Sequence, residues 1–446
     1  MTHDAMTQDA MTQDSMTEAG PQNWTIVGAT LPDGHRRDLH LVDGRLADEA
    51  APGATQIDAD GLVALPGLVD LHTHLREPGQ TEAETIVTGT AAAARGGYTA
   101  TFAMANTSPV TDNGERVRAL RALATDPSRP ARTEVVPIGA VTRGLAGQEL
   151  ADLDSMLAAG VRLFSDDGFS VPTAGLVRAA MEKLLPFDAV LAEHCQDPSL
   201  AGSSACCHEG EVSRELGLHG WPTIAESVII ARDVQIAGYL GARLHLCHVS
   251  TAEGVEILRW AKARGVRVTA EVMPHHLLLS VDDLHRSFLD GSGVDGSGDT
   301  TIKVNPPLRS ANDVEAVRQA LADGTIDAVA TDHAPHKAAD KALPFPQAKP
   351  GMIAIEQALS VVIETMVETG RMTWAQVADR MSHAPARIGA LPEQPASFVL
   401  VDPSRRTVVD RDQSLSLGRN NPYHGRSLPD PVVATFWRGR RTFAAG

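Results

Sequence analysis

The chain has 446 residues, 43% of them hydrophobic and 4% aromatic, which is enough for one large α/β barrel with an accessory domain. Its formal net charge of −17 disfavours nucleic acid as a partner. No stretch approaches the ~18 uncharged apolar residues of a membrane span, and no leader is evident, so we expect a cytoplasmic protein without a membrane partner.

The first 20 residues repeat a five-residue phrase, MTHDA, MTQDA, MTQDS and MTEAG. Almost nothing apolar lies between the methionines, so this segment has little to bury. A period of five residues matches no known solenoid. We therefore predict that residues 1–20 form a disordered tail.

Both ends of the remaining chain have sequence patterns that are typical of β-strands. The segments WTIVGATL, RDLHLVDGRL and TQIDADGLVALPG alternate in polarity and are separated by turn sequences. Similar segments, ASFVLVDP, RTVVDRD and PVVATFWRGRRTF, return near the C-terminus. We predict that residues 21–66 and 390–446 together form a small composite β-sandwich domain.

Between these ends, short apolar segments of strand type alternate with helical stretches rich in Ala and Glu, which is typical of α/β folds. Eight such strands are predicted, at 67–72, 99–104, 134–139, 161–165, 189–194, 243–248, 267–272 and 327–333. Eight parallel strands over this length fit a closed barrel, in which functional residues gather at the carboxyl ends of the strands. Residues 67–389 are thus predicted to form a (β/α)8 TIM-like barrel.

The polar residues of the middle region follow this rule. His72 and His74 stand two apart at the end of the first strand, so alternation places both imidazoles on one side of the chain. A lone H-x-H pair is weak evidence for a metal, but further candidate ligands end other strands. The full set is His72, His74, Asp167, His194, His248 and Asp332. Four imidazoles and two carboxylates suit zinc, as one ion or as two bridged by a carboxylate.

Other histidines and the cysteines are given more ordinary roles. Cys195 and Cys247 adjoin two candidate ligands, but alternation points both thiols away from the mouth, toward the helices. The four cysteines are too few and too scattered for a disulfide framework. His275 and His276 follow the seventh strand, where alternation allows only one of them to face the mouth.

Seven sequence motifs resemble those of a known enzyme family. HLREPG (74–79), MANTSPVTDN (104–113), FSDDG (164–168), EHCQD (193–197), EVMPHHLLL (271–279), KVNPPLR (303–309) and TDHAPH (331–336) occur in this order. Together with the ligand pattern they resemble the long-chain bacterial dihydroorotases of the amidohydrolase superfamily. The resemblance covers the chain from about residue 24 to its end.

The resemblance implies a zinc-dependent cyclic amide hydrolase that interconverts N-carbamoyl-L-aspartate and L-dihydroorotate in de novo pyrimidine biosynthesis. It implies that Asp332 carries the proton between the attacking water and the ring nitrogen. Because the substrate is a carboxylate and the protein is acidic, we expect a cationic clamp at Arg76. Asn106, Asn305 and His336 match the family's remaining substrate contacts.

Asp167 matches the family's bridging position by its spacing to His194. Many binuclear relatives use a carbamylated lysine instead, but Lys183 is the only lysine between His74 and His194, and it lies in a helical stretch. Asp166 then has a turn or supporting role.

Two other classes of function stay open. One is another cyclic-amide hydrolase, such as a dihydropyrimidinase, hydantoinase or allantoinase. The other is a non-catalytic dihydroorotase-like scaffold for aspartate transcarbamoylase. The resemblance also allows association with aspartate transcarbamoylase or with further copies of the chain.

Overall fold

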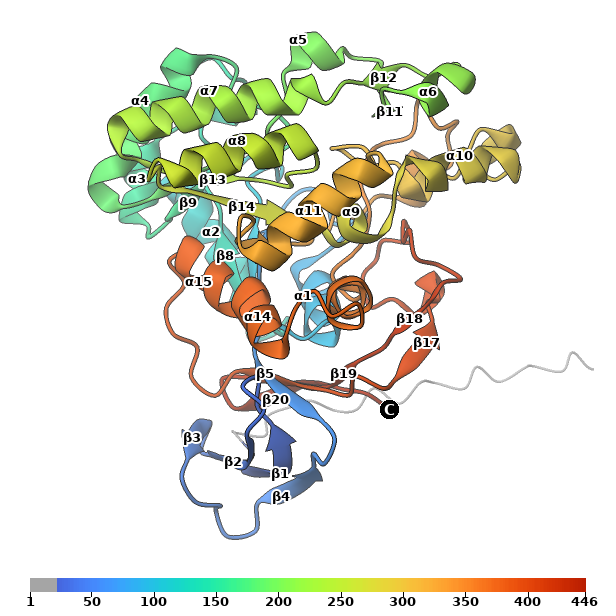
Figure 1. Cartoon of the computed structure of the whole chain (residues 1–446). Helices are drawn as coiled ribbons and strands as arrows, with labels where there is room; N and C mark the ends of the chain where they lie inside the picture. The colour runs from blue at the N-terminus through green and yellow to red at the C-terminus, as the bar shows by residue number, and fades with distance from the viewer. Residues whose placement is uncertain (1–21) are drawn as a thin grey trace, which may run out of the picture.

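The computed structural model describes residues 22–446, and the predicted tail at residues 1–20 lies outside the described residues. Two parts are visible (Figure 1): a barrel wrapped by helices, and a β-sheet beneath it in which both ends of the chain meet. Among residues 22–446, no helix combines the length and the apolar character that a bilayer crossing requires.

The barrel contains eight parallel strands in the predicted order. They are β6 (Leu68–Thr73), β7 (Tyr98–Ala103), β8 (Glu134–Pro137), β9 (Leu163–Phe164), β10 (Val190–Glu193), β13 (Arg243–Leu246), β14 (Val268–Val272) and β15 (Ala328–Val329). The first three pair in one sheet and the other five in a second. Parallel bridges from Gly139 to Phe164 and from Thr73 to His333 join the two sheets into a closed ring. The predicted (β/α)8 barrel is confirmed.

Helices cover the outside of this ring (Figure 1). They are α1 (Ile86–Arg95), α2 (Gly114–Ala124), α3 (Leu153–Ala158), α4 (Ala174–Leu184), α7 (Ile224–Leu240), α8 (Ala252–Ala263), α11 (Ala311–Asp323), α13 (Ala358–Val362), α14 (Trp374–Ala378) and α15 (Ala384–Ile388). Their starts are defined by polar caps: the side chains of Thr85, Asn113, Thr173, Thr251 and Ser310 each accept a hydrogen bond from the first helical turn.

Further short elements lie in the connections that follow the carboxyl ends of the strands. These are α5 (Pro198–Ala201), β11 (Cys207–His208), α6 (Glu211–Glu215) and β12 (Gly220–Trp221) after β10, α9 (Pro274–Leu278) and α10 (Val281–Leu289) after β14, and α12 (Ala338–Lys341) after β15. They surround the end of the barrel at which the predicted site residues lie.

Strand alternation divides the barrel core into two layers. In β10, Leu191 packs outward in the large cluster shared with the helices, whereas Val190 and Ala192 pack inward in the barrel interior. Continuing this alternation, Glu193 lies outward near Arg232 of α7 and His194 points inward. The period of two thus delivers His194 to the mouth of the barrel.

The second part is one eight-stranded sheet from both ends of the chain. Its strands are β1 (Trp24–Thr30), β2 (Arg36–Val42), β3 (Arg45–Ala47), β4 (Thr55–Asp58), β5 (Val63–Pro66), β16 (Phe398–Val401), β19 (Val432–Trp437) and β20 (Arg440–Ala444). The antiparallel pairing of β5 with β16 joins the two ends. The segment RTVVDRD lies elsewhere, because β17 (Arg406–Val408) pairs only with β18 (Ser427–Pro429) in a separate two-stranded sheet.

Candidate metal centre

The six residues predicted as metal ligands meet in one cluster at the carboxyl end of the barrel. They are His72 in β6, His74 just beyond it, Asp167 after β9, His194 after β10, His248 after β13 and Asp332 after β15. None of them is more than 6% exposed. Because parallel strands of a barrel end at one shared mouth, segments far apart in the sequence converge here.

Asp167 lies among all four histidines. Its Oδ1 atom is 3.2 Å from His72 Nε2, 3.3 Å from His194 Nδ1 and 3.5 Å from His248 Nε2. Its Oδ2 atom is 3.3 Å from His74 Nε2. Burial alone would raise the pKa of Asp167, but the positive charge of His72 and the hydrogen bond from His194 hold it well below its usual range. This position suits a carboxylate shared by two ions, and the bridging role stays a prediction.

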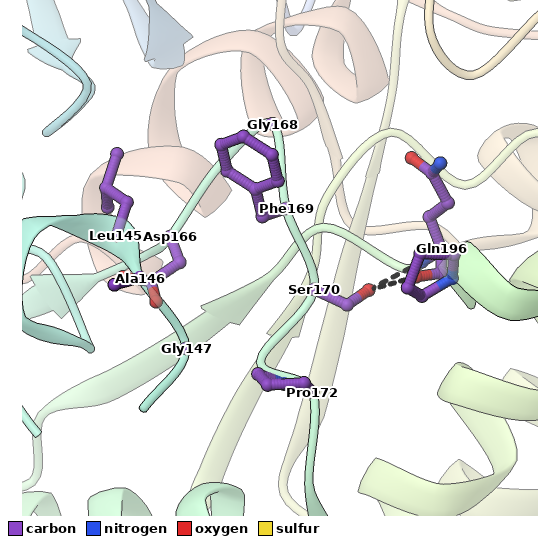
Figure 2. A pocket seen from close by; sticks show the side chains of 10 residues that line it. Leu145, Ala146, Gly147, Asp166, Gly168, Phe169, Ser170, Pro172 and Gln196 are labelled. Atoms are coloured by element: carbon purple, nitrogen blue, oxygen red, sulfur yellow. Dashed lines mark hydrogen bonds between the residues drawn. The ribbon is translucent and has the colours of Figure 1, made fainter. Parts of the chain in front are cut away.

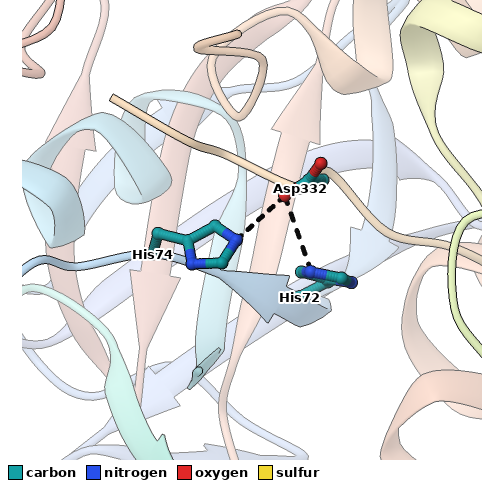
Figure 3. A group of neighbouring side chains, drawn as sticks. All are labelled: His72, His74 and Asp332. Carbon is teal, nitrogen blue, oxygen red and sulfur yellow. Dashed lines mark hydrogen bonds and ion pairs between the residues drawn. The ribbon is translucent and has the colours of Figure 1, made fainter. Parts of the chain in front are cut away.

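Asp332 follows β15, the neighbour of β6 in the closed ring, and faces the H-x-H pair (Figure 3). Its Oδ1 atom lies 3.0 Å from His74 Nε2 and 3.5 Å from His72 Nε2. The residue has a left-handed backbone with φ of 45°, which costs a non-glycine residue about 1–3 kcal/mol. The preceding residue is anchored to β6, because the amide of Thr331 donates to Asp70 Oδ1 at 3.0 Å.

The donor atoms fit a bound cation. Three groups have three ligand atoms within 4.8 Å of one another: His72, His74 and Asp332; His72, Asp167 and His248; and His72, Cys247 and Glu271. Within residues 22–446, His72 Nε2 and both ring nitrogens of His248 are buried without a hydrogen-bond partner. Leaving such atoms unpaired is unfavourable, and a metal ion is the partner that this mixture of nitrogen and oxygen donors accepts.

Three of the four histidines are held from behind by residues whose supporting role is not evident from the sequence. His72 Nδ1 lies 2.8 Å from Glu271 Oε1, His74 Nδ1 lies 3.0 Å from Asn106 Oδ1, and His194 Nε2 lies 2.8 Å from Gln196 Oε1. Burial alone would raise the pKa of Glu271, but hydrogen bonds from His245 and His72 lower it to about 2. Strand alternation in β14 predicts that the side chain of Glu271 points inward. It does not predict which histidine Glu271 contacts.

The prediction for the two cysteines is wrong for Cys247. Cys195 packs outward as expected, but Cys247 packs in the barrel interior and lies in one group with His72 and Glu271. The reason is the backbone of His248, whose φ of 36° is left-handed. This conformation interrupts strand alternation, so the consecutive side chains of Cys247 and His248 both point inward.

Arg76 lies at the edge of the cluster. Its Nε donates to the carbonyl of Pro335 at 3.2 Å, and no carboxylate among the described residues lies within ion-pair distance of its guanidinium. Burial lowers the pKa of Arg76, while the negative charges of Asp332 and Asp167 oppose this shift. The half-buried His336 is its neighbour: burial and the positive charge of Arg76 lower the pKa of His336 to about 3, so this imidazole is neutral.

The two predicted substrate asparagines lie in the same cluster. Asn106 uses its side-chain oxygen for His74. Asn305 donates to Gln196 Oε1 at 3.0 Å, and its own Oδ1 is buried without a hydrogen-bond partner among the described residues. Asn305 therefore offers a free acceptor beside the histidines, whereas Asn106 is already engaged.

His275 and His276 do not follow strand alternation, because they lie in helix α9. Both are buried, and their rings pack against each other with centroids 4.5 Å apart. His276 Nε2 lies 3.1 Å from the carbonyl of Pro306. Alternation therefore does not decide which of the two faces the mouth, because it applies to an extended strand and this segment is helical.

A cavity of about 200 Å³ adjoins the cluster on the side of the loop after Asp167 (Figure 2). Phe169 lines it and is 62% exposed, and Gln196 connects it to His194. Asp166 also lines the cavity, but its Oδ1 accepts hydrogen bonds from the amides of Val141 and Thr142 at 2.8 and 3.0 Å. Asp166 thus connects the loop after β9 to the loop after β8 and does not contact the histidines.

The comparisons by sequence agree on one family. The family described as "Dihydro-orotase-like" matches residues 61–254. The chain is 50% identical to the dihydroorotase of Streptomyces coelicolor over 436 residues, covering 94% of this chain and 98% of the relative. It is 46% identical to the dihydroorotase of Mycobacterium tuberculosis, covering 93% and 96%. Among solved structures, L-hydantoinase (dihydropyrimidinase) from Arthrobacter aurescens has the same fold, with a TM-score of 0.81 at 23% identity over 94% and 96% of the two chains.

Proposed function

The chain belongs to the dihydroorotase family, and from this membership we propose that it interconverts N-carbamoyl-L-aspartate and L-dihydroorotate with the help of zinc. The observation that carries the proposal is the convergence of four imidazoles and two carboxylates at the mouth of a barrel whose sequence is 41–50% identical to dihydroorotases. The reaction is a step of de novo pyrimidine biosynthesis.

We assign His72, His74, His194, His248, Asp167 and Asp332 to the binding of one or two zinc ions. A bound zinc ion supplies Lewis acidity, which makes water more acidic and polarises a carbonyl oxygen. If two ions are bound, Asp167 would be the ligand that they share, since its two oxygens face different histidines.

Asp332 is assigned to proton transfer. Burial alone would raise the pKa of this carboxyl group, but the charge of His72 and the hydrogen bond from His74 lower it, so that it is ionised at neutral pH. In ring opening it takes a proton from the attacking water and passes it to the departing ring nitrogen, and in ring closure it works in the reverse direction.

Substrate recognition is assigned to Arg76, with Asn305, His336 and Asn106 around it. The net negative charge of the protein repels the carboxylate of the substrate, so the site needs a positively charged side chain to bind it. The guanidinium of Arg76 supplies one that no carboxylate among residues 22–446 occupies. Its planar fork can bind both carboxylate oxygens, which an ammonium group cannot do in the same geometry.

Arg76→Lys is expected to lower kcat/KM roughly 10- to 100-fold, the loss of about one charge-assisted hydrogen bond. Steady-state kinetics with dihydroorotate measure the loss, and zinc content and melting temperature should stay at the wild-type level. Arg178→Lys is the control, because Arg178 pairs with Glu182 on the surface helix α4, away from the cluster. Wild-type kinetics in the Arg76 variant would remove this residue from the site.

The purified protein should contain zinc and should turn over dihydroorotate in clear preference to dihydrouracil, hydantoin and allantoin. The physical reason is that, of these four cyclic amides, only dihydroorotate presents a carboxylate to Arg76. Metal analysis and a four-substrate assay check this result. Preference for a ring without a carboxylate would favour the hydantoinase class, and a zinc-free, inactive protein would favour the scaffold.

The proposal includes a cytoplasmic location and a small-molecule substrate as the principal partner. The net charge of −17 supports the proposal that nucleic acid is not a partner. Homo-oligomers and a complex with aspartate transcarbamoylase are expectations from family resemblance.

A further inference from the structure

We propose that Glu271, supported by His245, is a positioning residue that fixes the tautomer and orientation of His72 for metal binding. This inference rests on the proposed function, because it concerns His72 as a ligand. Glu271 accepts from His72 Nδ1 at 2.8 Å through one oxygen and from His245 Nε2 at 3.0 Å through the other. Thr269 Oγ1 lies 2.9 Å from the remaining nitrogen of His245 and completes the chain.

The tautomer of His72 follows from the chemistry of these groups. An ionised carboxylate can only accept hydrogen bonds, so the ring nitrogen that faces Glu271 must carry the hydrogen. When His72 binds a metal ion its imidazole must be neutral, and the other ring nitrogen, Nε2, then holds the lone pair. That nitrogen lies 3.2 Å from Asp167 and 3.5 Å from Asp332 and is directed into the cluster.

His72 differs from the other two supported histidines in the charge of its partner. His74 and His194 face the neutral amide oxygens of Asn106 and Gln196. A carboxylate acceptor makes an imidazole a more basic ligand than an amide acceptor does. We therefore expect the partner of His72 to contribute more to metal affinity than either amide.

The surroundings argue against a purely structural role. Glu271 and His245 are each 1% exposed in the barrel interior, where neighbouring inward positions carry apolar side chains such as Val69, Leu71 and Val190. Burying ionised groups costs free energy, and well-packed apolar residues in their place are often as stable or more so. A charged group at this position is therefore better explained by its effect on His72 than by barrel stability.

The test measures zinc affinity rather than turnover. Zinc-stripped wild type, Glu271→Gln, Glu271→Leu and His245→Gln are titrated with zinc against a competing chelator, and the melting temperature of each metal-free protein is recorded. We expect roughly 10-fold weaker zinc binding for Glu271→Gln, which keeps an acceptor without the charge, and up to about 100-fold for Glu271→Leu. His245→Gln should fall between wild type and Glu271→Gln.

Glu84→Gln is the matched control. Glu84 is also buried and also contacts an imidazole, that of His333 at 3.3 Å, but His333 is outside the ligand set. The zinc affinity of the Glu84→Gln variant should equal that of the wild type. Wild-type affinity in both Glu271 variants, or an equal loss in Glu84→Gln, would overturn the inference while the zinc site of the proposed function stands. A wild type that binds no zinc would overturn the proposed function and this inference together.

Discussion

Asp332→Asn is expected to lower kcat by on the order of 10²–10⁴-fold, the range that general acid–base groups contribute. The amide keeps the size of the side chain and an oxygen toward His72 and His74, but it cannot accept the proton of the attacking water. Zinc content should therefore fall far less than turnover. Steady-state kinetics in both directions, beside metal analysis of the same preparations, separate the two effects.

The control for this variant is Asp340→Asn. Asp340 lies on α12 in the same connection after β15, where it pairs with Lys349 at 3.1 Å and does not contact the histidine cluster. Turnover in this control should match the wild type. If Asp332→Asn kept more than about a tenth of wild-type kcat, proton transfer would have to be assigned to another group.

Asp167→Ala is expected to reduce the zinc content of a two-ion enzyme and to lower its activity by at least roughly 100-fold. Loss of a residue that only supports a metal ligand can already lower metal affinity or activity by up to about 100-fold. The variant removes the one carboxylate that contacts all four histidines. Zinc-to-protein ratios and kcat, measured after reconstitution with excess zinc, report both effects.

Asp166→Ala is the neighbouring control. Its carboxylate holds the amides of Val141 and Thr142, so its loss should lower the free energy of unfolding by about 1–3 kcal/mol, while zinc content is affected less than in Asp167→Ala. Full zinc content and full activity in Asp167→Ala would contradict the bridging assignment.

Reconstitution should also be indifferent to bicarbonate. Lys183, the only lysine between His74 and His194, pairs with Asp154 at 2.8 Å on the exposed surface and cannot supply a carbamate to the cluster. Arg162, next to β9, donates to the carbonyls of Leu157 and Val161. A requirement for carbon dioxide during reactivation would show that the bridging anion is not Asp167.

The fold was predictable because its signals are local. Each barrel strand is a short apolar segment that ends in a polar residue, and a period of two is visible within a single segment. His194 illustrates this: Val190 and Ala192 face inward, so the residue two positions later does as well. In a parallel barrel all such ends meet at one mouth, so the convergence of the six predicted ligands required no knowledge of contacts.

The sequence by itself determined the barrel, the composite pairing of both chain ends and the set of residues that gather at the mouth. Only the tertiary structure decided how those residues are held. Glu271 meets His72 across 199 positions of sequence, Asn106 faces His74 across 32, and His248 points inward beside Cys247 because the backbone of His248 is left-handed. Such contacts depend on the register between strands and on single φ values, and neither leaves a periodic trace in the chain, so alternation within one strand could not reveal them.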